Sequence, residues 1–166
     1  MPGKIAIAYE DVITSDSDLW ANFAKYARLE GHTIYIIGEG PPYSVTDGLE
    51  YHGLFSDLHY DFAISLFSFL TKKGEDMYFN ETLHKWICRN PEIWAASKGR
   101  WCHENHISLM IEDNYLFHSA FKFIPTRLFM VCKAGARETI KSTVKLLHEK
   151  NEWFDDYEGE FNVHSM

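Results

Sequence analysis

Two pairs of acidic residues are the side chains in this sequence best placed to do chemistry. Glu10 and Asp11 close the first apolar run of the chain, and Glu112 and Asp113 close a later one. Short, uninterrupted apolar runs are typical of strands that are buried on both faces of a parallel sheet. Ligands of open α/β sheets bind outside the carboxyl ends of the strands. These four carboxylates could therefore supply oxygen ligands for a hard divalent cation such as magnesium.

The elements that must position these pairs alternate along the chain. Strand, helix and strand within the first 38 residues form a βαβ unit, whose crossover is expected to be right-handed. Apolar runs predict strands at residues 5–8, 33–37, 61–70, 107–111 and 127–132, the third of which runs into a helix or turn. Helical spacing predicts helices from residue 18, over 92–106 and over 137–150, with a short helix at 54–60. Residues 77–86 are expected to form a small hairpin or an irregular excursion.

This order predicts an α/β protein: a three-layer α/β/α sandwich with a mainly parallel central sheet and no large cap. The length of 166 residues suits a single domain over residues 1–166. Within it, residues 43–96 are expected to form an irregular excursion beside the pocket, and residues 151–166 an acidic tail. The link after the first strand is too short to carry a cap.

Composition restricts the partners and the compartment. The net charge of −8 argues against nucleic acid, because binding to phosphate backbones needs a basic surface. No apolar run approaches the length of a membrane span, and no signal peptide precedes the first strand, so no membrane association is expected. Cys88, Cys102 and Cys132 are odd in number and scattered in spacing, which is typical of reduced thiols in a cytoplasmic protein.

A lysine that precedes the second acidic pair by fourteen residues gives the most specific pattern. Ser97-Lys98 leads into the strand that ends in Glu112-Asp113-Asn114. This arrangement resembles the haloacid dehalogenase (HAD) superfamily, in particular its small phosphatases, over roughly residues 4–150. The resemblance implies a Rossmann-like (Rossmannoid) sheet, a lysine that balances the charge of nucleophile and phosphate, and an acidic pair that helps to hold magnesium.

The first two motifs of that family lack their working groups here. The family begins with Asp-x-Asp-Gly, and the equivalent residues are Ala8, Tyr9, Glu10 and Asp11. Ala8 takes the place of the aspartate that attacks phosphorus, and its methyl group has no lone pair to attack with. Glu10 corresponds to the general acid/base. The second strand ends at Gly38, where the family has a Thr or Ser that binds the phosphoryl group.

These departures leave three hypotheses. The first is a pseudoenzyme that has lost phosphatase activity and binds a small phosphorylated or anionic ligand, or a partner protein. Its predicted ligand-binding residues are Lys98, Gly38 and Asn114, and its predicted metal ligands are Glu10, Glu112 and Asp113.

The second hypothesis is an active magnesium-dependent phosphohydrolase (a hydrolase) with an atypical site, in which Glu10, Asp11 and Lys98 would be catalytic. The third is a pure interaction module or homodimer that uses the aromatic side chains between residues 43 and 94.

Overall fold

The computed structural model describes residues 2–131, so Cys132, the predicted helix at 137–150 and the tail at 151–166 lie outside the described residues. The strands are β1 (Lys4–Ala8), β2 (Thr33–Gly38), β3 (Phe62–Ser65), β4 (Met77–Asn80), β5 (Lys85–Cys88), β6 (Leu109–Glu112) and β7 (Arg127–Met130). The helices are α1 (Ser17–Leu29), α2 (Pro42–Tyr51), α3 (Leu66–Lys72) and α4 (Pro91–Glu104), with a π-helical turn η1 (Tyr9–Ile13) and a 3-10 helix η2 (Tyr115–Phe121).

Within residues 2–131, five strands form one sheet in the order β3-β2-β1-β6-β7, and every pair in it is parallel. From β1 the chain runs outward through β2 and β3 to one edge, and after the separate hairpin it returns beside β1 with β6 and runs outward through β7 to the other edge. The strand order therefore reverses between β1 and β6, and such a switch point is where open α/β sheets bind their ligands. The predicted α/β fold with a mainly parallel sheet is confirmed.

The central position of β1 explains its composition. It pairs with β2 on one side and β6 on the other, and its residues from Ile5 to Ala8 are buried. A strand covered on both faces needs apolar side chains on both, which is why its sequence does not alternate. The helix that follows begins at Ser17, where the Asp16 side chain accepts a hydrogen bond from the Leu19 N–H.

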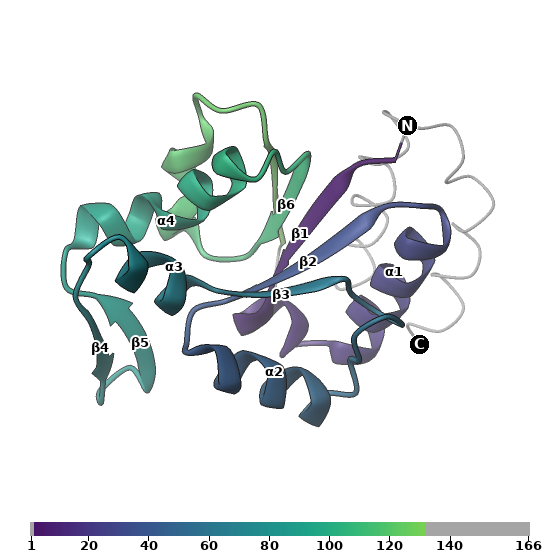
Figure 1. Ribbon diagram of the computed structural model, residues 1–166, viewed down its shortest axis with the longest axis horizontal. Coiled ribbons are helices and arrows are strands. Elements are labelled where there is room, and N and C mark those ends of the chain that lie inside the picture. The colour runs from purple at the N-terminus through teal and green to yellow at the C-terminus, as the bar shows by residue number, and fades with distance from the viewer. Residues whose placement is uncertain (1, 132–166) are drawn as a thin grey trace.

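The helices cover both faces of the sheet (Figure 1). α1 and α2 lie on one side, and α4 with η2 lies on the other, which gives the three layers predicted from the sequence. The antiparallel hairpin of β4 and β5 projects beside α3 and α4, away from the main sheet. No large cap covers the sheet in the described part of the chain.

The segment between β2 and β3 differs from its prediction. Residues 42–51 form the regular helix α2, which begins with Pro42 in its first turn. The short helix predicted at residues 54–60 is wrong, because this stretch is a turn closed by a bridge between Ser56 and Tyr60. The predicted strand-to-helix passage at residues 61–70 is confirmed by β3 and α3, and the predicted hairpin by β4 and β5.

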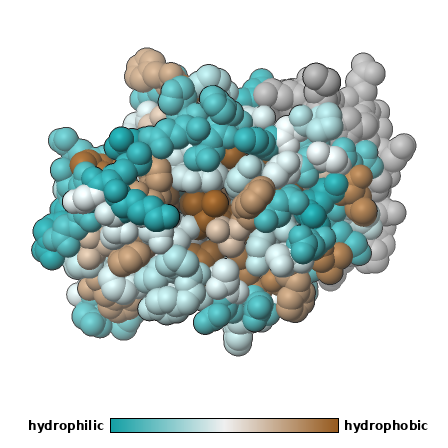
Figure 2. All heavy atoms as spheres, in the orientation of Figure 1, coloured by the Kyte–Doolittle hydropathy of each residue, from teal (hydrophilic) through white to brown (hydrophobic). Residues whose placement is uncertain are grey.

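Figure 2 shows a surface on which hydrophilic side chains predominate and apolar ones gather in small groups, one of them near the centre of this face. None of the helices within residues 2–131 is both long and apolar enough to cross a membrane.

Candidate site at the carboxyl ends of the central strands

A buried lysine and a buried glutamate form the centre of the site. Lys98 projects from α4 and Glu112 ends β6, and each side chain is only 1% exposed. The Lys98 ammonium donates a hydrogen bond to Glu112 Oε2. The other oxygen, Oε1, accepts the backbone N–H groups of Asp113 at 2.9 Å and Asn114 at 3.1 Å. Both oxygens of Glu112 are thus engaged, and this carboxylate is held rigidly at the end of its strand.

An aromatic ring covers the ammonium group from the side of η2. Lys98 Nζ lies 4.1 Å from the centre of the Phe117 ring, and Phe117 is itself fully buried against Trp94. A desolvated ammonium over a ring face gains a cation–π attraction. The close approach of η2 to α4 depends on Gly99, because a Cβ atom there would lie 2.6 Å from the Cβ of Ala120.

Two further glutamates approach from the ends of β1 and β2. Glu10 lies in η1, directly after β1, and its Oε1 accepts the Glu39 backbone N–H at 2.8 Å. Glu39 follows β2 and is only 4% exposed. Glu10 Oε2 is buried and has no hydrogen-bond partner within the described residues. The carboxyl ends of β1, β2 and β6 therefore carry one glutamate each near the lysine of α4. Glu39, Glu112 and Lys98 are buried, and Glu10 is half-buried with its Oε2 atom in the interior.

Burial and mutual repulsion change how easily these groups ionise. Burial first, and then the negative charge of Glu39, raise the pKa of Glu10 to about 8, although Lys98 opposes them. Burial likewise raises the pKa of Glu39. Burial alone would lower the pKa of Lys98, but the charges of Glu39, Glu112 and Glu10 outweigh it and raise that pKa. The lysine is therefore charged at neutral pH, while Glu10 holds its proton.

The residues aligned above with Asp-x-Asp-Gly, from Ala8 to Asp11, include both buried and exposed positions. Ala8 is completely buried at the end of β1, opposite Ile37 of β2. Asp11 is exposed, and its φ of +64° is a left-handed conformation that glycine adopts most easily. Its N–H donates to Thr14 Oγ1 at 2.9 Å. Of the predicted catalytic residues, Glu10 and Lys98 thus join the buried cluster and Asp11 does not.

Gly38 and Asn114, both predicted to bind ligand, have local structural roles. A Cβ atom at Gly38 would overlap the Val45 side chain, so the glycine permits α2 to pack on the end of β2. The Asn114 side chain accepts the Leu116 N–H at 3.0 Å and caps η2. These contacts explain both residue types without a ligand, and the binding roles stay predictions.

The predicted metal ligands do not form a coordination site as they stand. Glu112 uses both oxygens in hydrogen bonds, and Glu10 offers only Oε2. No group of three or more His, Cys, Asp or Glu side chains in the part of the chain that the structure describes is arranged to hold a metal ion. Lys98 instead supplies the positive charge that the buried carboxylates require. Magnesium binding stays a prediction.

Sequence reasoning missed two members of the cluster. Glu39 lies in an acidic turn between Gly38 and Gly40, which looks like an ordinary solvated loop in the sequence. Phe117 lies in a short aromatic stretch with no periodic pattern. Only the position of Glu39 directly after a buried strand could have suggested it, by the same argument that selected Glu10.

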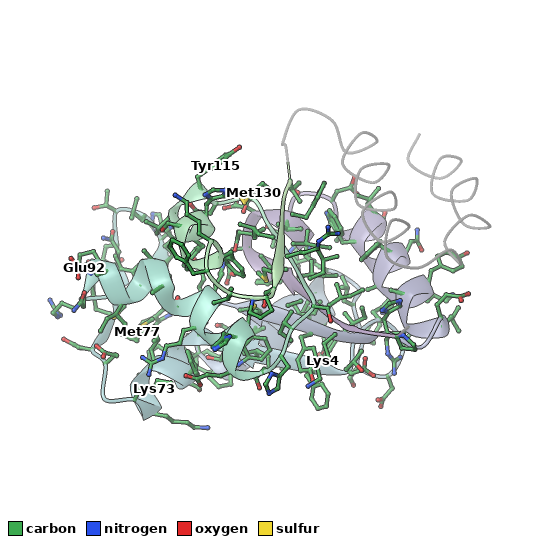
Figure 3. The ribbon with its side chains drawn as sticks, turned by 90° about the horizontal axis from the view of Figure 1, so that it is seen from above. Lys4, Lys73, Met77, Glu92, Tyr115 and Met130 are labelled. Atoms are coloured by element: carbon green, nitrogen blue, oxygen red, sulfur yellow. The ribbon has the colours of Figure 1, made fainter. Side chains whose placement is uncertain are left out.

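The aromatic side chains proposed as an interaction surface do not share one environment. Tyr60 and Trp94 are buried, whereas Tyr51 is 86% exposed. Phe67 and Phe79 both pack edge-on against Trp86 and stabilise the hairpin. Further exposed aromatics lie elsewhere, such as Tyr115 of η2, which points outward in Figure 3 and is 76% exposed. A single continuous aromatic face is therefore not formed by these residues.

No protein-family model matches the chain, and no curated protein matches it.

Proposed function

We propose that this chain is a HAD-like protein that no longer transfers phosphoryl groups and that uses the switch point of its sheet for binding. The observation that carries the proposal is Ala8, which is completely buried at the end of β1 where the resemblance requires a nucleophilic aspartate. A covalent phosphoryl intermediate needs an oxygen or nitrogen at that point, and a methyl group supplies neither.

The topology supports the resemblance to the HAD superfamily. The lysine lies on the helix that precedes β6, the acidic pair follows at the end of β6, and β6 lies next to β1. Asp11 also fits the alignment with Asp-x-Asp-Gly, because it has the left-handed backbone that a glycine would provide. These placements agree with the order of motifs on which the resemblance depends.

The state of the remaining groups also argues against turnover. The Lys98 ammonium is engaged by Glu112, so a phosphate would have to displace that carboxylate to reach it. Asp11, one of the alternative nucleophiles, is exposed beyond the end of the strand. Glu10 can hold a proton at neutral pH and could act as an acid, but an acid without a nucleophile does not complete the family's reaction.

The proposal includes binding of a small phosphorylated or anionic ligand. The negative charges of the buried carboxylates set a condition for this binding. Within the described residues, buried carboxylates outnumber Lys98 at the site, and Lys85 of β5 is the second positive charge that acts on Glu39. An anion gains affinity here only if protonation or a bound cation first offsets the glutamates. Binding of phosphate should therefore strengthen as the pH falls below about 8.

The proposal is tested by magnesium-dependent hydrolysis of a panel of phosphate esters, with Glu10→Gln and Asp113→Asn as controls. We expect no turnover by any of the three proteins, and a rise in melting temperature with phosphorylated metabolites for the wild type. Turnover that both variants abolish would contradict the proposal and indicate an active phosphohydrolase with an atypical site. Absence of both turnover and ligand-induced stabilisation would leave the interaction module as the better hypothesis.

A further inference from the structure

The ammonium group of Lys98 is shared by carboxylates from three adjacent strand ends. It bonds to Glu112 at the end of β6, and the charges of Glu39 and Glu10 also stabilise it. Glu39 and Glu10 are joined in turn by the hydrogen bond from the Glu39 N–H to Glu10 Oε1. One contact thus lies at the end of β6 and one between the ends of β1 and β2, and the charge of Lys98 acts on both.

We propose that Lys98 is the resident cation of this site: its ammonium group joins the carboxyl ends of β1, β2 and β6 electrostatically, so the folded site needs no divalent metal ion. The proposal rests on the contacts of the buried cluster and is independent of whether the chain hydrolyses phosphate esters.

The arrangement around Nζ favours an ammonium over a metal ion. Glu112 has no oxygen left for coordination, since Oε1 is occupied by two backbone N–H groups and Oε2 by the lysine. Phe117 covers Nζ at 4.1 Å and offers a ring face, which attracts an ammonium but is no ligand for a hard divalent cation. A divalent ion could enter only by displacing the lysine from a fully buried position.

An ordinary buried ion pair would not explain the cluster equally well. Such a pair is self-contained and can often be replaced by apolar groups without loss. Here the charge of Lys98 also acts on Glu10 and Glu39, and it lowers the pKa of both against the effect of burial. Lys98 therefore interacts with carboxyl groups at three strand ends, and no other buried lysine or arginine lies within residues 2–131 to take its place.

The first measurement compares the melting temperature of the wild-type chain in EDTA with that in excess magnesium chloride, with sodium chloride matched for ionic strength. A site that is complete without metal should show a difference below about 1 °C, because only a ligand that binds the native state stabilises it. A rise of several degrees that is specific to magnesium would overturn the proposal.

The second measurement tests whether an added ammonium ion can take the place of the Lys98 side chain. Lys98→Ala removes the cation and leaves space, and its melting temperature should fall by roughly 10 °C or more. Ethylammonium chloride should restore part of this loss. Tetramethylammonium chloride should not, because that ion has the same charge and no N–H donor. Equal effects of the two salts, or rescue by magnesium in place of ethylammonium, would contradict the proposal.

Lys98→Met provides the matched control, because it removes the same charge and fills the space with an apolar chain. Ethylammonium should not raise the melting temperature of Lys98→Met. If Lys98→Ala does not fold, the magnesium comparison on the wild-type chain still tests whether the site needs a divalent metal ion. A wild-type chain that binds no magnesium and hydrolyses phosphate esters would refute the proposed function and leave the resident cation intact.

Discussion

Two ion pairs of this molecule join similar groups in opposite surroundings. Lys98 and Glu112 meet in the interior with side chains 1% exposed, whereas Arg89 and Asp76 meet beside the hairpin with side chains 65% exposed. Water screens the exposed pair, and its loss costs little. The buried pair has lost its hydration, so removing one partner leaves a charge that nothing compensates. The contrast indicates that the switch point, and not the surface, is where charge controls this fold.

The largest expected effect comes from breaking the buried pair. Lys98→Met should lower the free energy of unfolding by about 3–5 kcal/mol, because Glu112 then remains buried without its counter-charge. The double variant Lys98→Met/Glu112→Gln should lose less than the sum of the two single variants. Urea unfolding measures the free energy of unfolding of the single and double variants, with Lys72→Met at an exposed position as the control. Strictly additive losses would show that the two side chains are not coupled.

The next prediction concerns the role of Gly38 in the packing of α2 on the end of β2. Gly38→Ala should lower the free energy of unfolding by about 1–3 kcal/mol, because the new methyl group meets Val45 of α2. Combining it with Val45→Ala should relieve the overlap, so that the double variant is more stable than the sum of the single losses predicts. Thermal unfolding without ligand is the measurement. A neutral Gly38→Ala would instead leave ligand binding as the reason for the glycine.

A smaller effect follows from the buried Glu10 carboxyl. Its pKa rises from the ordinary value of 4.5 for a glutamate to about 8 in the folded chain. Between those values the folded state keeps a proton that the unfolded state has released, so stability must fall as the pH rises through this window. The slope contributed by one group is at most about 1.4 kcal/mol per pH unit. The raised pKa of Glu39 acts in the same direction.

Glu10→Gln should flatten this dependence, since a neutral amide replaces the protonated acid and releases no proton. Urea midpoints measured from pH 5 to pH 9 would reveal the difference, with the exposed Glu81→Gln as the matched control. An unchanged slope in Glu10→Gln would show that the proton is held elsewhere in the cluster.

The smallest effect is expected from the exposed pair. Arg89→Met should leave the unfolding midpoint unchanged, because both side chains remain hydrated whether or not they touch. The same experiment at low and high salt completes the comparison, since any small loss in Arg89→Met should be confined to low salt, whereas the loss in Lys98→Met should persist at high salt. A loss as large as that of Lys98→Met would remove the distinction between the two regions.

The sequence predicted much of the scaffold, because a strand that is buried on both faces appears in the sequence as an uninterrupted apolar run. The apolar runs of β1, β2 and β6 each identified a central strand, and the acidic residues where β1 and β6 end identified Glu10 and Glu112. α2 was missed for a physical reason. Its apolar stripe is short, and Gly48 within it is unfavourable for a helix but necessary here, since a Cβ there would overlap the Tyr9 side chain.

What the sequence determined by itself is the α/β architecture, the apolar end of the first strand at Ala8 and the candidate residues Glu10, Lys98 and Glu112. Only the tertiary structure decided their burial and their contacts. Lys98 and Glu112 are fourteen residues apart, and nothing in that spacing reveals that both side chains are desolvated and joined. Glu39 enters the cluster only because β2 lies beside β1. Burial changes the energy of a charge, and burial is a property of the assembled layers.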